Sequence, residues 1–148
     1  MAGWLRLWPK PRHGKNLRYL ALSWSGLQED PLLLIAAHVP NLSYLSLNRV
    51  SGTETMVISE GSFPQLKALI LKNMLNVNQL TVGKDALPNI EGLYIVALPK
   101  LNKFPEGFES LVSLRKLWLL SLHKDFKILW ALSRMRQKMP QVVEVRVE

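Results

Sequence analysis

The amino-acid sequence predicts an α/β fold built from stacked repeats, and three observations support this prediction. Six segments of the 148-residue chain share one pattern, with aliphatic residues at the first, fourth and sixth positions. The first members of these segments lie 25, 24, 24, 24 and 28 residues apart. Four of the six segments follow a proline and an amide residue. Periods of roughly 20–29 residues with this strand signature are typical of leucine-rich repeats.

The six segments predict the strands of one parallel sheet, at residues 17–22, 42–47, 66–71, 90–95, 114–119 and 142–147. Alternate side chains of a strand face opposite sides, so the last two aliphatic residues of each segment point inward together. A single repeat cannot bury this face, and stacked repeats share one continuous core. The predicted fold is therefore a leucine-rich-repeat solenoid. Its curved sheet forms the concave side, and loops and short helices form the convex side.

The segments that connect the strands predict mostly short elements. Residues 31–38 begin with proline directly after Glu29 and Asp30, which favours the start of a helix. Residues 50–62 are polar and contain two glycines, so we expect a loop there. Residues 98–114 contain two prolines and a glycine, which favour turns over a long helix.

The last connecting segment, residues 124–139, predicts one amphipathic helix that caps the array. Its apolar residues fall roughly on one helical face, at Ile128, Leu129, Leu132, Met135 and Met139. The basic residues Lys127, Arg134 and Lys138 fall elsewhere. A basic amphipathic helix can also bind a membrane surface or calmodulin. We favour packing against the final strands.

The front of the chain predicts only part of a repeat, at residues 1–16. Leu5 and Leu7 resemble the end of an earlier strand, but only 12 residues separate Leu5 from Leu17. Natural arrays carry a polar cap at each end, and we find none here. We therefore expect a single domain over residues 1–148 that is the C-terminal piece of a longer array.

The composition fits an ordinary globular domain, with 48% hydrophobic and 20% charged residues. No uncharged apolar run approaches the roughly 20 residues that a membrane-spanning helix needs. The first eight residues are too short and too interrupted by Arg6 for a secretory signal. The chain has no cysteine, which excludes disulfides and thiolate metal sites. We expect a cytoplasmic protein with no membrane span.

The net charge of +8 comes from 19 basic and 11 acidic residues. Such a surplus can favour nucleic acid or anionic lipid. The basic residues are spread along the chain, and only residues 10–18 and 124–138 form loose groups. We interpret the surplus as solvated surface charge, or else as a surface for an acidic protein, and expect no nucleic-acid partner.

Several phrases of the sequence are more specific than the repeated leucines, at residues 17–25, 27–32, 40–42, 63–67 and 101–111. Two of them lie in the segments that connect one strand to the next, here called returns. They are an acidic-Pro-Leu pattern at residues 30–32 and a Pro-x-Gly-x-x-x-Leu pattern at residues 105–111, and generic repeats lack both. Over roughly residues 17–120 the chain resembles the C-terminal repeats of plant intracellular immune receptors. These are the coiled-coil class of nucleotide-binding leucine-rich-repeat (NB-LRR) disease resistance proteins.

The resemblance implies a sensor region for innate immunity. Such a region holds the receptor inactive and responds to a pathogen effector or to a guarded host protein. Its partners would be that protein and the nucleotide-binding domain of the parent receptor.

The chain also departs from the receptor pattern. It has no Gly-x-x-x-x-Gly-Lys-Ser/Thr loop, so we do not expect it to hydrolyse nucleotide alone. Residues 9–14 differ from the return expected before Leu17. The position that often carries asparagine in these repeats holds Ser25, Val50, Met74, Leu98 and Leu122. Backbone groups at the strand ends therefore need other partners.

The sequence gives little support for catalysis, and we predict no catalytic, cofactor-binding or metal site. His13, His38 and His123 are isolated from residues at ligand spacing. Residues 23–26 lack the glycine that a nucleophile elbow needs two positions before the serine. We interpret the glycosylation sequon at residues 41–43 as chance.

Two other classes of binding protein remain open, a leucine-rich-repeat signalling scaffold and a ubiquitin-ligase substrate receptor. Scaffold repeats usually keep a more regular 23-residue period than the 24 to 28 residues found here. Substrate receptors tend to carry cysteine where this chain has Ser25, Val50 and Met74, and an F-box should precede them.

The outward residues of the predicted strands supply the candidate binding surface. One row consists of Ala21, Ser46, Ile70, Tyr94, Trp118 and Arg146, and a second row of Tyr19, Tyr44, Ala68, Gly92, Lys116 and Glu144. Aromatic residues favour strands without any binding role, but exposed Trp, Tyr and Arg dominate binding energy at interfaces. We predict a protein-binding concave face formed by Tyr19, Tyr44, Ile70, Tyr94, Lys116, Trp118 and Arg146.

Overall fold

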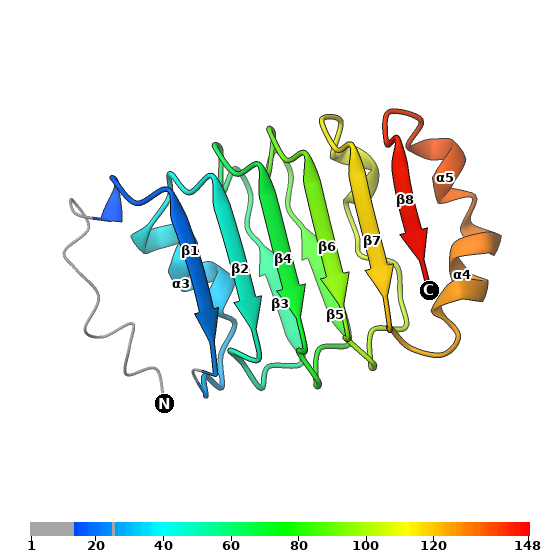
Figure 1. Cartoon of the computed structure of the whole chain (residues 1–148), viewed down its shortest axis with the longest axis horizontal. Helices are drawn as coiled ribbons and strands as arrows, with labels where there is room; N and C mark the ends of the chain where they lie inside the picture. The colour runs from blue at the N-terminus through cyan, green and yellow to red at the C-terminus, as the bar shows by residue number, and fades with distance from the viewer. Residues whose placement is uncertain (1–13, 25) are drawn as a thin grey trace.

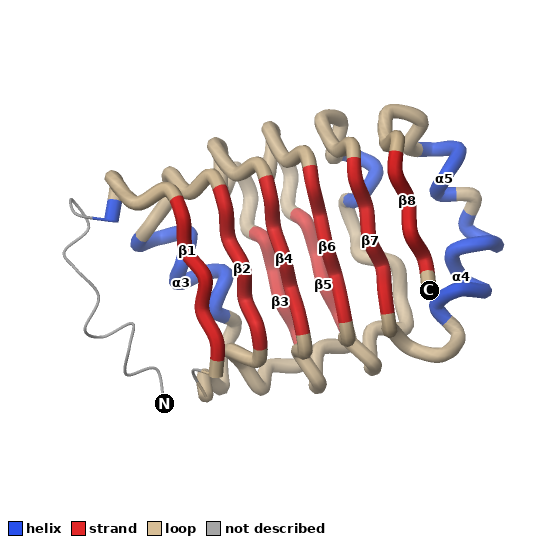
Figure 2. The backbone as a smooth tube through the Cα atoms, in the orientation of Figure 1, coloured by secondary structure: helices blue, strands red, loops and turns tan. Residues whose placement is uncertain are grey.

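The computed structural model describes residues 14–24 and 26–148 of the chain. In this part the chain forms an α/β fold with a six-stranded and a two-stranded parallel sheet. Figures 1 and 2 show the larger sheet as one layer, with α3, β3 and β5 in a second layer behind it. Most of the expected partial repeat at residues 1–16, including Leu5 and Leu7, lies outside the described residues.

The larger sheet contains the six strands that the sequence predicts. They are β1 (Tyr19–Ser23), β2 (Tyr44–Asn48), β4 (Ala68–Lys72), β6 (Gly92–Val96), β7 (Lys116–Leu120) and β8 (Glu144–Val147). They pair in the order β1-β2-β4-β6-β7-β8, so each strand lies beside the next strand of this sheet in the sequence. The predicted register is confirmed, because the middle aliphatic residues of all six segments lie side by side.

Each strand starts two residues later than predicted. The first aliphatic residue of a segment closes a tight turn instead of joining the ladder. The backbone N–H of Leu66, for example, donates to the carbonyl of Phe63, and Ile90 and Leu114 do the same three residues back. These first residues are still fully buried. The motif therefore combines one turn residue with two strand residues that share the same core.

The inward side chains of the central strands form one continuous hydrophobic core. Leu45, Leu69, Leu93 and Leu117 are fully buried, as are their partners two residues later in each strand. At the two edges of the sheet Leu22, Val145 and Val147 are only partly buried. No charged or polar side chain among the described residues is buried.

The predicted loop at residues 50–62 is wrong, because it contains β3 (Thr55–Ile58). This strand pairs in parallel with β5 (Gln79–Val82). Met56 and Ile58 point into the core and are fully buried. Their alternation is only four residues long and is flanked by polar residues, so the segment as a whole has a polar composition.

The predicted helix at residues 31–38 is confirmed as α3 (Pro31–His38). The Asp30 side chain caps it by accepting a hydrogen bond from the N–H of Leu32 at 2.9 Å. The same carboxylate accepts from Val57 in β3 at 2.6 Å, which ties the helix to the second layer. Partial burial raises the pKa of the Asp30 carboxyl, and these two backbone hydrogen bonds oppose that shift.

The return at residues 98–114 contains turns and one short 3-10 helix, η1 (Phe108–Ser110), in agreement with the sequence. Gly107 precedes this helix with a φ of +90° and lies against Val82, where a Cβ atom would meet the Val82 carbonyl oxygen. Only glycine fits this close approach between neighbouring returns.

The C-terminal segment forms two helices instead of the predicted one. They are α4 (Phe126–Ser133) and α5 (Met135–Lys138), separated by Arg134 in the left-handed conformation with a φ of +56°. Because this break resets the helical phase, Met135 and Met139 are buried while Ile128 and Leu132 are 60% and 75% exposed.

The buried face of α4 is aromatic, which the aliphatic pattern of the sequence did not indicate. Phe126 is buried, and Trp130 packs against the core. The Phe104 ring lies 5.3 Å from that of Phe126 and 5.6 Å from that of Trp130. This cluster attaches α4 to the return of the preceding repeat.

Backbone groups at the strand ends find partners in the next strand, as the missing asparagines required. The residue that follows each of the first five strands of the larger sheet has a positive φ, at Trp24, Arg49, Asn73, Ala97 and Ser121. The N–H of each donates to a carbonyl at the end of the adjacent strand, over 2.8–3.1 Å. Three residues at the position where these repeats often carry asparagine join the core instead. They are Val50, Met74 and Leu98, and all three are fully buried. Ser25 is not described.

Candidate functional site

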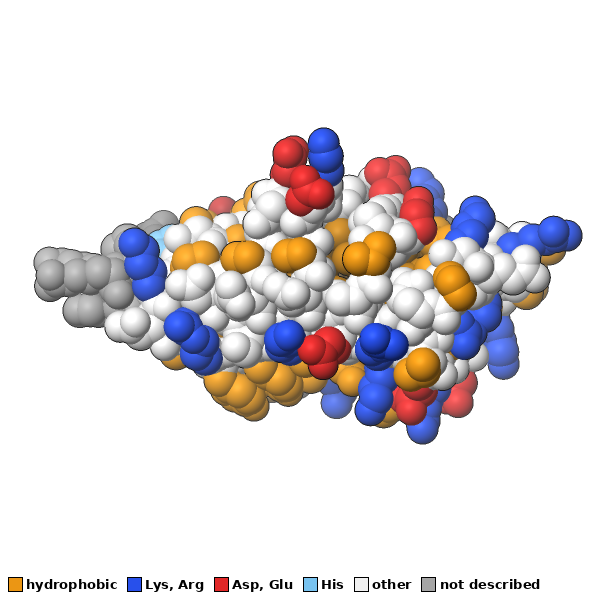
Figure 3. Space-filling model, turned by 90° about the horizontal axis from the view of Figure 1, so that it is seen from above, with side chains coloured by type: hydrophobic (Ala, Val, Ile, Leu, Met, Phe, Trp, Pro, Cys, Tyr) orange, Lys and Arg blue, Asp and Glu red, His pale blue; other side chains and the backbone are white. Residues whose placement is uncertain are grey.

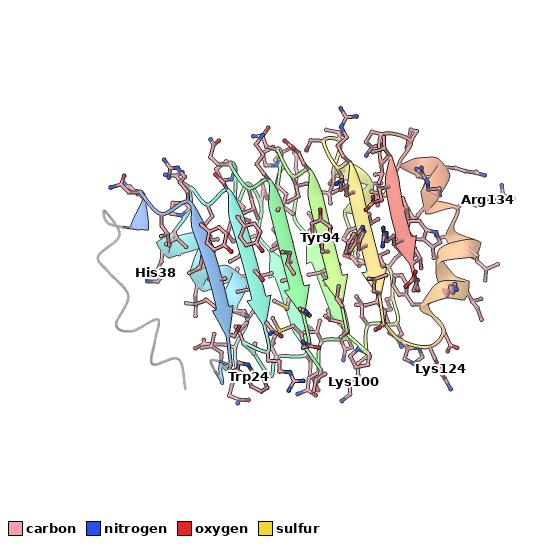
Figure 4. The ribbon with its side chains drawn as sticks, viewed as in Figure 1. Trp24, His38, Tyr94, Lys100, Lys124 and Arg134 are labelled. Carbon is pink, nitrogen blue, oxygen red and sulfur yellow. The ribbon has the colours of Figure 1, made fainter. Side chains whose placement is uncertain are left out.

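The outward face of the six-stranded sheet carries both predicted rows in register. Tyr94 pairs with Ile70 on one side and with Trp118 on the other, and Trp118 pairs with Arg146. Lys116 lies in the other row, beside Gly92 and Glu144. Figure 4 shows Tyr94 near the middle of this face.

A groove of about 540 Å³ crosses three strands of this face. We call it the β4–β7 groove, and it is lined by Ile70, Lys72, Tyr94, Val96, Lys116, Trp118 and Leu120. A smaller hollow of about 280 Å³ adjoins it and shares Tyr94 and Lys116. The structure therefore brings together Ile70, Tyr94, Lys116 and Trp118 of the predicted surface.

The Tyr94 ring is positioned by the absence of a side chain at Gly92. A Cβ atom at Gly92 would lie 2.6 Å from the Tyr94 hydroxyl oxygen and 2.7 Å from the ring. The ring therefore lies over Gly92, two residues earlier on β6. It meets Trp118 edge to face, with the centroids 5.1 Å apart and the planes at 89°, a favourable geometry for aromatic pairs.

Trp118 is held by two residues of β8. Its indole Nε1 donates a hydrogen bond to Glu144 Oε2 at 2.5 Å. The guanidinium carbon of Arg146 lies 4.7 Å from the centroid of the ring, and Arg146 Nε lies 3.9 Å from the same Glu144 oxygen. Arg146 was predicted to contact a partner, but it does not line the groove. Its position over Trp118 indicates a supporting role.

Tyr19 and Tyr44 form a separate patch at the other end of the sheet. Their rings stack at 4.4 Å with an interplanar angle of 1°. Burial raises the pKa of Tyr44, and the hydrogen bond and charge of Tyr19 raise it further. Ala68 on β4 is the register partner of Tyr44, and strands β4 and β6 separate this patch from Trp118 on β7.

Sequence reasoning missed a third outward row at the strand ends. It contains Lys72, Val96 and Leu120 in register, and all three line the groove. Lys72 therefore lies on the candidate binding surface, although the predicted set of residues does not include it. The same alternation, extended by one residue past the motif, predicts this row.

Sequence reasoning also missed an exposed aromatic residue beside the sheet. Trp24 is 69% exposed, and the Arg49 guanidinium lies 4.5 Å from its ring centroid. Figure 4 shows Trp24 at the lower end of β1, away from Tyr94.

The charges around the groove are unequal. Lys72 and Lys116 line it, and no carboxylate does so. Glu91 lines only the smaller hollow and forms an ion pair with Lys67 at 3.2 Å. Lys and Arg side chains are spread along the described part of the face that Figure 3 shows from above. The groove is therefore an apolar surface with a positive margin.

The described residues contain no group of three or more His, Asp or Glu that could hold a metal ion. His38 belongs to α3 and its Nδ1 lies 2.8 Å from the Leu34 carbonyl oxygen. His123 lies 3.8 Å from Asp125, and His13 falls outside the described residues. No helix in the described part of the chain is long and apolar enough to cross a membrane.

Comparison of the chain with family models, with curated proteins and with solved structures finds no match. The assignment of a function therefore depends on the geometry described above and on the resemblance noted in the sequence.

Proposed function

We propose that this chain is a leucine-rich-repeat solenoid that binds proteins through the outward, concave face of its sheet. The observation that carries the proposal is the β4–β7 groove, in which two aromatic residues are held in place beside two lysines. Trp and Tyr side chains in well-packed pockets that exclude water on binding are among the residues that contribute most to protein binding energy.

The solenoid part of the proposal is supported by the order of the strands. Six parallel strands pair in sequence order, and the backbone ladder at their ends links every repeat to the next. Repeats that contact only their neighbours form extended surfaces suited to binding proteins.

Prior organisation of the groove supports a binding role over a purely structural one. The hydrogen bond from Trp118 to Glu144 and the cation–π contact with Arg146 fix the indole before any partner arrives. Fixing a side chain in advance lowers the entropy cost of association. Residues that only fill a strand do not need such supports.

Within this class, we propose a sensor region of a plant NB-LRR immune receptor. It would act in the cytoplasm, without catalysis of its own. Its partner would be a pathogen effector or a guarded host protein, and it would restrain the nucleotide-binding domain of its receptor. The returns at residues 27–32 and 101–111 support this assignment over the scaffold and ubiquitin-ligase alternatives.

The test is a defence-response assay in leaves that express the full receptor containing these residues. Trp118→Ala and Tyr94→Ala should abolish the response to the cognate signal without lowering the protein level. Trp24→Ala is the matched control, because it removes an exposed tryptophan outside the groove and should leave the response intact. Loss of recognition from changes in residues 50–62, with the groove variants still active, would place the partner on the other face.

A further inference from the structure

The two lysines of the β4–β7 groove stand at opposite corners of it. Lys72 ends strand β4, whereas Lys116 begins strand β7, two strands away. A strand spacing of about 4.8 Å and a rise of about 3.3 Å per residue place their Cα atoms about 16 Å apart. The groove therefore has a lysine at each of two opposite corners and apolar residues between them.

The apolar part of the groove lies between these two corners. Ile70, Tyr94, Val96, Trp118 and Leu120 line it, one or two from each of three adjacent strands. The perpendicular arrangement of the Tyr94 and Trp118 rings forms a corner rather than a flat platform. Such a corner fits one bulky side chain.

We propose that the β4–β7 groove binds an extended segment of a partner protein in which one large apolar residue is flanked on both sides by acidic residues. The apolar side chain enters the corner between Tyr94 and Trp118, and the carboxylates pair with Lys72 and Lys116. An extended chain covers about 16 Å in about five residues, so the two acidic residues lie four or five positions apart. This inference rests on the proposed function, since it specifies the partner of the same groove.

The geometry favours a peptide over a single-stranded nucleic acid. Nucleic-acid grooves expose aromatic faces on which bases stack and follow the backbone with many cations. Here the Arg146 guanidinium covers one face of Trp118, and the lining of the groove includes only two cations. The lysines are too far apart to bind one phosphate together, but they match two separated carboxylates.

The experiment is a selection of random 12-residue peptides displayed on phage against the 148-residue chain. We expect the recovered peptides to share a large apolar residue with Asp or Glu on both sides, four or five positions apart. The same selection on the Lys72→Glu, Lys116→Glu double variant should recover peptides with Lys or Arg at the flanks and the same apolar residue. Lys84→Glu on the opposite layer is the matched control and should recover the original peptides.

Binding constants of one recovered peptide then test each contact. We expect Lys116→Glu and Lys72→Glu each to weaken binding at least tenfold, with the wild-type affinity falling as salt is raised. Trp118→Ala should weaken it at least as much at any salt concentration. Circular dichroism spectra of the variants should match the wild type, because both lysines are exposed surface residues.

The inference is overturned by peptides without acidic enrichment, by recovery of the same peptides on the double variant, or by the absence of peptides that compete for the groove. Tighter binding of a single-stranded RNA oligonucleotide that Lys72→Glu and Lys116→Glu abolish also overturns it. These outcomes are separate from failure of the proposed function. If Trp118→Ala still removes the defence response, the groove binds a partner of different chemistry. If Trp118→Ala leaves the response intact, the proposed function itself is wrong.

Discussion

The outward face of the sheet carries two aromatic pairs, each on two adjacent strands but in different rows, and the two pairs are held differently. Tyr19 and Tyr44 stack flat on β1 and β2, and Tyr19 remains 61% exposed. Tyr94 and Trp118 meet edge to face on β6 and β7, and both are partly buried. The second pair is supported by its neighbours at Gly92, Glu144 and Arg146.

The difference shows that strand register alone does not create a groove. Register places two aromatic residues side by side in both regions. The second region differs in the residues around its rings. Gly92 leaves room beneath the Tyr94 ring, Glu144 accepts a hydrogen bond from Trp118, and the Arg146 guanidinium lies over the Trp118 ring. These supports set the ring planes perpendicular and leave the groove beside them.

The largest expected effect comes from a core substitution in β4, the strand between the two regions. Leu69 is fully buried between Leu45 and Leu93. Leu69→Ala should lower the free energy of unfolding by about 2–5 kcal/mol, since it leaves a cavity in the shared core. Denaturant unfolding measures this loss, with Thr81→Ala as a control expected to stay within about 0.5 kcal/mol. A loss from Leu69→Ala no larger than that of the control would contradict the register.

A smaller effect is expected from removing the space beneath Tyr94. Gly92→Ala places a Cβ atom 2.6 Å from the Tyr94 hydroxyl oxygen, so the ring must move. The edge-to-face contact with Trp118 is then lost, which should cost about 0.5–1.5 kcal/mol. A double-mutant cycle with Tyr94→Ala measures this cost. If Gly92→Ala lowers stability equally in the Tyr94→Ala background, the cost arises from the strand backbone and not from the Tyr94 ring.

A still smaller effect is expected from the cation over Trp118. Arg146→Ala should lower stability by about 0.5–1 kcal/mol, the usual strength of a cation–π contact at an exposed site. Arg49→Ala, which removes the matching cation over Trp24, is the control for stability. Only Arg146→Ala should also weaken binding in the β4–β7 groove. Equal effects of the two variants on binding would show that Trp118 needs no support.

The smallest effect concerns the pKa of Tyr44, which burial and then Tyr19 raise above the ordinary value of 10.0. Tyr44 therefore keeps its proton to higher pH in the folded chain than in the unfolded chain. Its contribution to stability is complete below pH 10.0 and declines as the pH rises through the folded-state pKa. Tyr19→Phe should lower this pKa toward its ordinary value without removing the contribution of burial, whereas Tyr94→Phe should not change it. Ultraviolet titration of the folded variants measures both.

The repeated pattern was sufficient to predict the larger sheet. The spacing of Leu45, Leu69, Leu93 and Leu117 determines both the register and the buried face, because a one-residue shift would expose the whole core. The helix at residues 31–38 also followed from local signals, since Asp30 and Pro31 favour a helix start in any context.

Elements that depend on contacts between repeats were not predictable in this way. Strand β3 has a short alternation, and it becomes a strand because β5 of the next repeat lies beside it. The packing of Phe126 and Trp130 depends on the Phe104 ring of the previous return. In both cases the deciding partner is about 20 to 30 residues away in the sequence.

The sequence by itself determined which residues of the sheet face outward, including Tyr94, Lys116 and Trp118. The tertiary structure decided which of them form a groove, because ring orientation depends on the residues next to each ring in space. It placed Arg146 over the Trp118 ring, outside the lining of the groove, and it placed Lys72, which the predicted surface did not include, in that lining. Alternation along a strand is a local property of the backbone. The shape of a groove is set by side chains that only the packing of several strands brings together.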